Sequence, residues 1–260
     1  MSRTIVIANQ KGGVAKTTTA VNLGIGLARA GKRVLLIDND PQGSLTEALG
    51  YQEPDSLEIT VATIMERVLN EEKFILTDGI LHHEEGVDLL PANIELAGVE
   101  TSLIGIMSSE SILKEYIEMV ESSYDYVVID CSPNLGQLTL NALVAADDVI
   151  IPVQAAFLPI KGLEQLLKTI SRVKRKLNQK LNILGILLTM VDYRTNFAKN
   201  ITEVLYQVYG SSIHIFNNCI PLSVKAAEIS AQGVSIYKYD KNGKAAKAYE
   251  ELTKEVLGNE

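Results

Sequence analysis

Residues 9 to 19 read Asn-Gln-Lys-Gly-Gly-Val-Ala-Lys-Thr-Thr-Thr, and this stretch decides the fold. An apolar run at residues 4–8, typical of a buried strand, precedes it, and a segment with apolar residues at helical spacing follows it. A strand, a glycine-bearing loop, a lysine with a hydroxyl residue and then a helix make up the layout of a phosphate-binding loop. The stretch therefore predicts that the chain binds ATP or GTP.

The loop supplies the groups that a triphosphate requires. Backbone N–H groups at a helix amino terminus carry partial positive charge, which suits phosphate oxygens. Lys16 is predicted to reach the β- and γ-phosphates, and Thr17 to offer its hydroxyl group to Mg²⁺. The predicted nucleotide-binding residues of the loop are Lys11, Gly12, Gly13, Val14, Ala15, Lys16, Thr17 and Thr18.

The loop departs from the common pattern G-x-x-x-x-G-K-[ST] at two positions. Gln10 and Ala15 stand where the pattern has glycines, and a second lysine, Lys11, stands at the head of the loop. If position 15 needs a positive φ, alanine costs about 1–2 kcal/mol there. Such a cost weakens nucleotide binding without abolishing it.

Three aspartates follow two other apolar runs. Asp38 and Asp40 come after Leu35-Leu36-Ile37, and Asp130 comes after Tyr126-Val127-Val128-Ile129. In sheets of parallel strands, ligands bind beyond the carboxyl ends, so these carboxylates are expected beside the loop. One of Asp38 and Asp40 is expected to order Mg²⁺-bound water and the other to position the attacking water. Asp130 is predicted to hold Mg²⁺ through water.

Apolar, β-branched runs alternate with helical segments along the chain. The runs lie at residues 4–8, 34–37, 87–90, 126–129, 149–153, 183–188 and 213–216. This alternation predicts an α/β fold with a mostly parallel, twisted β-sheet flanked by helices on both faces. No repeat, low-complexity tract or flexible linker divides the chain, so a single domain over residues 1–260 is expected.

Composition narrows the class of protein. The 260 residues carry a net charge of −8, and the two cysteines, Cys131 and Cys219, form no disulfide or zinc pattern. No apolar run approaches the roughly 18 residues that span a bilayer. The amino terminus lacks the organisation of a secretory signal. A cytoplasmic protein without a membrane partner is expected, and His82-His83-Glu84-Glu85 is expected to be a solvated loop rather than a metal site.

Three motifs in order resemble the ParA/MinD group of ATPases, whose phosphate loop is of the deviant Walker A type. They are Lys11-Gly12-Gly13-x-x-Lys16-Thr17, Leu35 to Gly43, and Tyr124 to Asp130 followed by Pro133. Asp192-Tyr193-Arg194-Thr195-Asn196 and Ile220-Pro221 resemble the ParA (Soj) partition branch in particular. The resemblance runs from residue 3 to residue 256.

The resemblance implies a P-loop NTPase that hydrolyses ATP slowly with Mg²⁺. It implies that Lys11 crosses a dimer interface to the phosphates of the ATP in the other subunit, which places cations on both sides of the nucleotide. It favours Asp40 for hydrolysis and Asp38 for the magnesium shell, and it places Pro221 beside the adenine. The implied catalytic residues are Lys11, Lys16 and Asp40.

A DNA partner is expected in spite of the acidic average. Residues 161–180 contain seven basic residues and one acidic residue, and they read as an amphipathic helix on which Arg172, Arg175 and Lys176 are candidate phosphate contacts. The resemblance adds Arg194. Family members usually carry an arginine after Pro221, but Leu222 stands here, so any DNA contact of that arginine either moves to Lys225 or is lost.

The activity implied by the family is partition of a chromosome or plasmid. An ATP-dependent homodimer binds DNA non-specifically, associates with the nucleoid, and releases DNA on hydrolysis, which a ParB-like centromere-binding protein stimulates. Doubling the phosphate contacts in a dimer strengthens such binding steeply.

Three alternatives stay open. A MinD-like positioning ATPase needs a basic amphipathic helix at its end. Residues 243–260 instead predict a helix that packs Ala248, Leu252 and Val256, with Glu250, Glu251 and Glu255 outward. A reductase that resembles the nitrogenase iron protein needs cluster cysteines, whereas Cys131 reads as a small packed residue. A regulator of replication or transcription with little hydrolysis is kept open by Ala15.

Overall fold

One β-sheet organises the chain. The computed structural model describes residues 2–155, 160–192 and 194–258. The strands within them form one seven-stranded sheet in the order β3-β4-β2-β5-β1-β6-β7. Their bounds are β1 Arg3–Ile7, β2 Val34–Asn39, β3 Leu81–His82, β4 Asp88–Leu90, β5 Tyr126–Cys131, β6 Asp148–Gln154 and β7 Asn182–Thr189. β3 is antiparallel to β4 and the other pairs are parallel. The predicted α/β class is confirmed.

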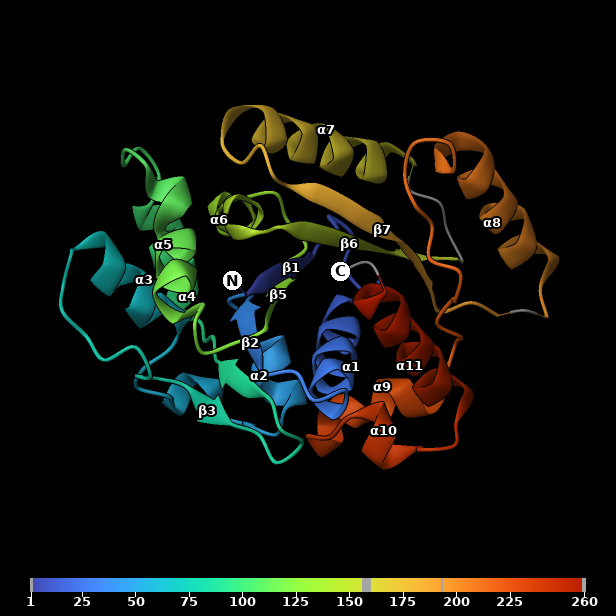
Figure 1. The fold of residues 1–260 in the computed structure, drawn as a ribbon, viewed down its shortest axis with the longest axis horizontal. Coiled ribbons are helices and arrows are strands. Elements are labelled where there is room, and N and C mark those ends of the chain that lie inside the picture. The colour runs from blue at the N-terminus through green and yellow to red at the C-terminus, as the bar shows by residue number, and fades with distance from the viewer. Residues whose placement is uncertain (1, 156–159, 193, 259–260) are drawn as a thin grey trace.

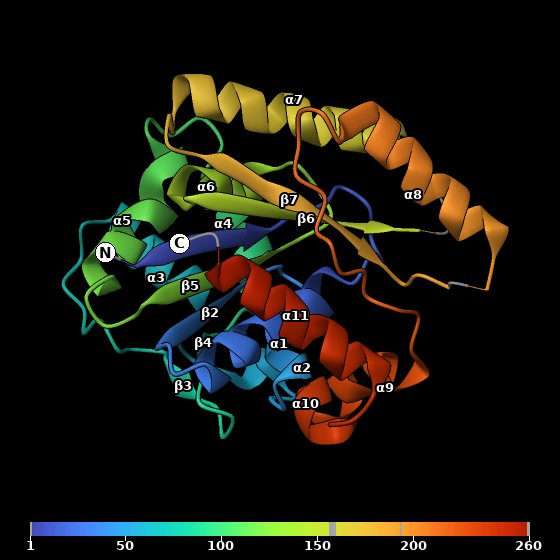
Figure 2. The same cartoon turned by 45° about the vertical axis from the view of Figure 1, so that its right-hand side comes forward.

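Helices cover both faces of this sheet (Figure 1). One face carries α1 Lys16–Arg29, α2 Ser44–Ala48, α9 Val224–Gln232, α10 Ile236–Tyr239 and α11 Lys244–Leu257. The other carries α3 Val61–Leu69, α4 Glu95–Ser102, α5 Ile112–Val120, α6 Gln137–Ala145, α7 Ile160–Lys176 and α8 Asn196–Tyr209. Two 3₁₀ helices, η1 Pro54–Ser56 and η2 Ser109–Ser111, lie in loops. The turned view of Figure 2 shows α7 and α11 on opposite sides of the sheet.

Alternation along each strand divides the apolar side chains between two cores. In β1, Ile5 and Ile7 join the core under α1 and α11, whereas Val6 joins the core under α3 to α7. Successive side chains of a strand point to opposite faces, so a strand covered on both faces is apolar throughout. This is why β1, β2 and β5 read as unbroken apolar runs.

The predicted strands differ from the sheet at two places. Residues 213–216 form no strand: Ile215 makes only an isolated bridge to Ile186. Ile186 N–H donates to His214 O and Phe216 N–H donates to Ile186 O. Further along, Ile220 N–H donates to Leu188 O, so the segment follows the edge of β7 through separate hydrogen bonds without forming a strand. The two-residue strand β3 was not predicted, because so short and polar a stretch carries no alternating pattern.

The carboxyl-terminal helix packs as predicted, apart from one glutamate. Leu252 and Val256 are buried against α1, and Glu250 and Glu251 are exposed. Glu255 does not point outward: its carboxylate accepts hydrogen bonds from His214 Nε2 (2.8 Å) and Asn217 Nδ2 (3.0 Å). It therefore ties α11 to the segment beyond α8, a contact that helical periodicity cannot predict.

Candidate functional site

The phosphate loop joins the carboxyl end of β1 to the amino end of α1. Gly13 has φ of 68° and Ala15 has φ of 64°, and α1 begins at Lys16. The first N–H groups of a helix have no acceptor within the helix, so they point out of its amino end. The conformation supposed for position 15 is thus the one that the chain adopts, and Ala15 carries the cost of a left-handed backbone, about 1–2 kcal/mol.

Gly12 differs from its neighbour. It is exposed, its φ is not positive, and a Cβ added to it meets only the Cβ of Pro133, at 3.9 Å. A methyl group therefore fits at position 12 as far as this chain alone is concerned.

Two side chains outside the motif hold the loop in shape. Asn9 donates through Nδ2 to Pro152 O (2.6 Å) and accepts from Lys11 N–H (2.9 Å). Thr189, fully buried at the end of β7, donates through Oγ1 to Val14 O (3.0 Å). Sequence reasoning missed both residues, although each is a polar residue that follows an apolar strand.

The two lysines of the loop occupy different environments. Lys16 is 7% exposed, and its Nζ donates to Lys11 O at 3.3 Å. Lys11, at the head of the loop, is half-buried. A buried ammonium group beside the N–H groups of the loop is what a chain needs in order to bind a triphosphate.

Asp38 and Asp130 lie side by side on neighbouring strands. They are direct partners in the β2–β5 register, and both are buried. Burial raises the pKa of Asp38 to about 7, and burial together with the neighbouring Asp38 carboxylate raises the pKa of Asp130 to about 8. Two adjacent carboxylates without water are costly unless a cation lies near them.

The two carboxylates are not equivalent. Asp38 Oδ2 accepts from Thr46 N–H (2.8 Å) and Thr46 Oγ1 (2.7 Å), and Asp38 Oδ1 accepts from Asp40 N–H (3.2 Å). Asp130 interacts with the Thr17 hydroxyl and with Lys16, but its Oδ1 has no hydrogen-bond partner among the described residues. The unpartnered oxygen beside Thr17 suits a bound cation, and Thr46 is a further site residue that the sequence did not indicate.

Asp40 stands at the rim of the same edge. Its side chain is half-buried, and its Oδ1 accepts from Gln42 N–H (3.1 Å). The three predicted carboxylates and the loop are thus brought to the same edge of the sheet.

An apolar cavity of about 320 Å³ adjoins the loop. Pro221, which the resemblance places beside the adenine, lines this cavity, and so do Tyr249 and Met190, which sequence reasoning missed. Met190 has φ of 53°, an unusual conformation for a methionine. The remaining lining residues include Gly13, Ala15, Lys16, Thr17, Thr18, Ile220, Leu222 and Ser223.

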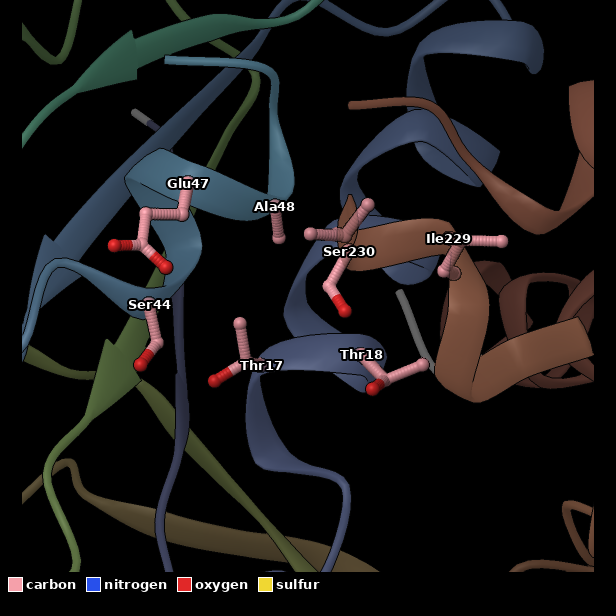
Figure 3. A pocket seen from close by; sticks show the side chains of 8 residues that line it. Thr17, Thr18, Ser44, Glu47, Ala48, Ile229 and Ser230 are labelled. Carbon is pink, nitrogen blue, oxygen red and sulfur yellow. The ribbon is translucent and has the colours of Figure 1, made fainter. Parts of the chain in front are cut away.

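A second cavity, of about 250 Å³, shares Thr17 and Thr18 with the first. Figure 3 shows these two threonines at the start of α1, between Ser44 and Glu47 of α2 on one side and Ser230 of α9 on the other. The start of α1 is therefore accessible from both sides.

The predicted DNA contacts fall into two separate groups. Arg194 and Lys225 follow segments joined by hydrogen bonds, from Val191 N–H to Ile220 O (3.0 Å) and from Leu222 N–H to Val191 O (3.1 Å). Arg172, Arg175 and Lys176 are exposed on the last turns of α7. Because α7 runs back between the parallel strands β6 and β7, its last turns lie near the amino edge of the sheet, away from Arg194. The structure does not bring the five cations into one patch; Tyr193 and the Lys161 side chain lie outside the described residues.

Two minor predictions have opposite outcomes. Cys131 is buried, which raises the pKa of its thiol, as expected for a packed residue. The His82–Glu85 segment is not simply solvated, because Glu85 accepts from Ser235 N–H (2.8 Å) and Oγ (2.6 Å).

In the part of the chain that the structure describes, no group of three or more His, Cys, Asp or Glu residues is arranged to hold a metal ion. No described helix is long and apolar enough to cross a membrane.

Comparison with known proteins gives the family. A family model described as an AAA domain matches residues 2–183. The sporulation initiation inhibitor protein Soj of Bacillus subtilis is 42% identical over 259 residues, with both chains covered completely. The chain belongs to the ParA/Soj family of partition ATPases. The chromosome partitioning protein ParA of Caulobacter vibrioides (strain NA1000 / CB15N) is 38% identical, over 99% of this chain and 95% of its own.

A solved structure agrees with the fold. The crystal structure of cobyrinic acid a,c-diamide synthase from Mycobacterium smegmatis, with bound ADP and magnesium, matches with a TM-score of 0.86 and 37% identity. The match covers 99% of this chain and 94% of that one. The predicted membership of the ParA/Soj family, its P-loop fold and its ATPase class are therefore confirmed.

Proposed function

We propose that this protein is an ATP-dependent partition ATPase that binds DNA non-specifically as an ATP-sandwich dimer and releases it on hydrolysis. The observation that carries the proposal is the edge of the sheet where Lys16 and Thr17 adjoin a buried, unpartnered Asp130 oxygen and an apolar cavity lined by Pro221. Family membership over the whole chain supports the cellular role.

The site residues fit ATP and Mg²⁺. The base lies in the apolar cavity with Pro221 and Tyr249, and the loop from Gly12 to Thr18 cradles the phosphates. Mg²⁺ usually takes few protein ligands besides water and phosphate oxygens, so Thr17 and Asp130 suffice to hold it. Asp38, whose oxygens are engaged by Thr46 and Asp40, would order water bound to the metal ion. Mg²⁺ supplies neutralisation of the charge on the phosphate oxygens.

Hydrolysis depends on charge placed on both sides of the γ-phosphate. Asp40, at the rim of the site, positions the attacking water, and Lys16 neutralises charge from within the chain. Lys11, on the outer side of the loop, reaches the nucleotide of a second copy, so the dimer completes each site. A ParB-like partner raises the rate of this step.

DNA binding follows from dimerisation. Phosphate contacts are independent of sequence and weaken steeply with salt, so two joined copies bind far more tightly than one. Arg194 and Lys225 are the proposed contacts near the nucleotide edge. A second surface, on α7, contacts a separate stretch of DNA through Arg172, Arg175 and Lys176. The ATP-bound form then associates with the nucleoid.

A second candidate function is supported by the backbone at Ala15. Its left-handed conformation stores strain in the loop, which is consistent with a nucleotide-dependent regulator of replication or transcription that hydrolyses little ATP. Turnover in the presence of DNA and a ParB-like partner separates the two functions, because only the partition ATPase is stimulated by the partner.

Salt-titrated DNA binding with ADP, ATP and a non-hydrolysable ATP analogue tests the proposal. We expect the wild type to bind DNA with ATP and the analogue but weakly with ADP, and we expect Lys11→Ala to lose this dependence. Lys73→Ala, which removes an exposed lysine between α3 and β3, is the control and is expected to behave as wild type. Equal DNA affinity in every nucleotide state would contradict the proposal.

A further inference from the structure

Both cations proposed to contact DNA near the nucleotide edge are already engaged by carboxylates of their own chain. Arg194 is 87% exposed, yet its Nε donates to Asp192 Oδ1 and its Nη2 to Asp192 Oδ2, each at 2.8 Å. The same guanidinium group lowers the pKa of Asp192 to about 2. A parallel pair of N–H donors is also the arrangement by which arginine binds a phosphate group.

Lys225 is also engaged by a carboxylate of its own chain. Its Nζ donates to Asp240 Oδ1 at 2.9 Å, and it is more than half exposed. Asp240 ends α10, far from Lys225 in sequence, so the pair is not a by-product of neighbouring positions. Each of the two cations therefore forms a locally neutral pair.

The cations on α7 differ in this respect. Within the described residues, no ion pair engages Arg172, Arg175 or Lys176. Two groups of cations thus exist on one acidic molecule, and only the group that lies near the nucleotide edge is opposed by aspartates. Exposed ion pairs contribute little to stability, so stability alone does not account for the two aspartates.

We infer that Asp192 and Asp240 are internal competitors for the phosphate groups of DNA, and that they lower the DNA affinity of a single copy. The inference rests on the proposed function. A phosphate that approaches Arg194 or Lys225 must either displace the carboxylate or lie beside it. In the second case the negative charges of the phosphate and the carboxylate repel each other. The competition weakens binding without preventing it, because an exposed pair opens at small cost. A single copy then holds DNA poorly, and two joined copies are needed.

Asp192→Asn tests this inference. Asparagine keeps an Oδ1 atom, so it still accepts the hydrogen bond from Arg194 N–H that shapes the turn. With the charge removed, binding of a labelled random-sequence duplex is expected to tighten about two- to fivefold at low salt. The slope of log K against log salt is expected to steepen by about 0.9, the value of one phosphate contact. Asp240→Asn is expected to act in the same way, and Asp192→Asn/Arg194→Ala to lose the gain.

Asp125→Asn is the matched control. Asp125 holds Arg33 through the same pair of arginine atoms, Nε (3.2 Å) and Nη2 (2.8 Å), and its pKa is likewise lowered to about 2 by that arginine. It precedes β5 at the amino edge of the sheet, away from Arg194 and Lys225, so its loss changes net charge equally without altering either of these two pairs. We expect no gain in DNA affinity from this variant.

The outcomes separate this inference from the proposed function. If the wild type with ATP binds no DNA at any salt concentration, the proposed function fails. If the wild type binds and Asp192→Asn binds equally or more weakly, the inference fails, and Asp192 then positions Arg194 for DNA. A gain of the same size in Asp125→Asn also overturns the inference, since net charge alone would explain it.

Discussion

At the scale of single residues, Ala15 is the position where the chain departs most from what its backbone requires. A left-handed conformation suits glycine, and alanine tolerates it only because the surrounding loop is fixed by Asn9 and Thr189. The strain is stored directly before Lys16 and Thr17, so it bears on nucleotide binding more than on the core.

Ala15→Gly is expected to raise the free energy of unfolding by about 1 kcal/mol, because the left-handed conformation no longer costs energy. Nucleotide affinity is expected to rise as well. Chemical denaturation and nucleotide titration measure the two effects. Ala97→Gly, in the exposed middle of α4, is the control and should lower stability by about 0.5–1 kcal/mol. A loss of stability in Ala15→Gly would show that the backbone at Ala15 is not strained.

Asp40→Asn is expected to reduce ATP turnover about a hundredfold or more while nucleotide affinity stays nearly unchanged. The reason is that the Asp40 side chain is half-buried and, among the described residues, accepts a hydrogen bond only from Gln42 N–H, so the fold does not depend on its charge. Steady-state turnover and equilibrium nucleotide binding give the two values. Glu53→Gln removes a nearby exposed carboxylate and should leave both unchanged. Full turnover in Asp40→Asn would remove Asp40 from the hydrolytic step.

At the scale of elements, the end of β7 supports the phosphate loop. Thr189 donates to the loop at Val14, Met190 then lines the apolar cavity in a left-handed conformation, and Val191 N–H donates to Ile220 O. One strand end therefore contacts both the loop and the apolar cavity beside it. The loop depends on β7 for its shape although the two are far apart in sequence.

Thr189→Val is expected to cost about 1–2 kcal/mol of stability, since Val14 O is left without its buried donor. Nucleotide affinity should fall with it, because the loop loses a contact on the side that faces the base. Thr101→Val makes the same substitution where the hydroxyl bonds an exposed helix carbonyl, and it should change little. Unchanged affinity in Thr189→Val would show that the loop keeps its shape without β7.

At the scale of the whole molecule, the two apolar cores share one sheet. Each described strand except β3 sends side chains to both cores, so neither core persists once the strands separate. We propose that residues 1–260 form a single domain that unfolds as one unit.

Thermal unfolding is expected to show one transition, with the same midpoint by far-ultraviolet circular dichroism, by tyrosine fluorescence and by calorimetry. Mg²⁺ with a non-hydrolysable ATP analogue should raise the midpoint, since a ligand that binds only the folded state stabilises it. Two transitions with different midpoints would contradict a single domain.

Local pattern predicts those parts of the molecule that depend on neighbours in sequence. The loop, Lys16, Thr17 and the aspartates at the strand ends follow from the order of strand, loop and helix. Thr46, Thr189 and Tyr249 were not predicted, because each reaches the site from an element whose position depends on tertiary packing. The error at Glu255 has the same origin. Helical periodicity predicts on which side of α11 a residue lies, but it does not predict which segment packs against that side.

Gly12 leads to a diagnostic use of substitution. Among the residues that the structure describes, only Pro133 comes within 4 Å of a methyl group placed there. Gly12→Ala should accordingly leave the isolated polypeptide as stable as wild type. If this variant is then defective in binding nucleotide or a second copy, the added methyl group clashes with that partner. Position 12 therefore becomes a probe of assembly.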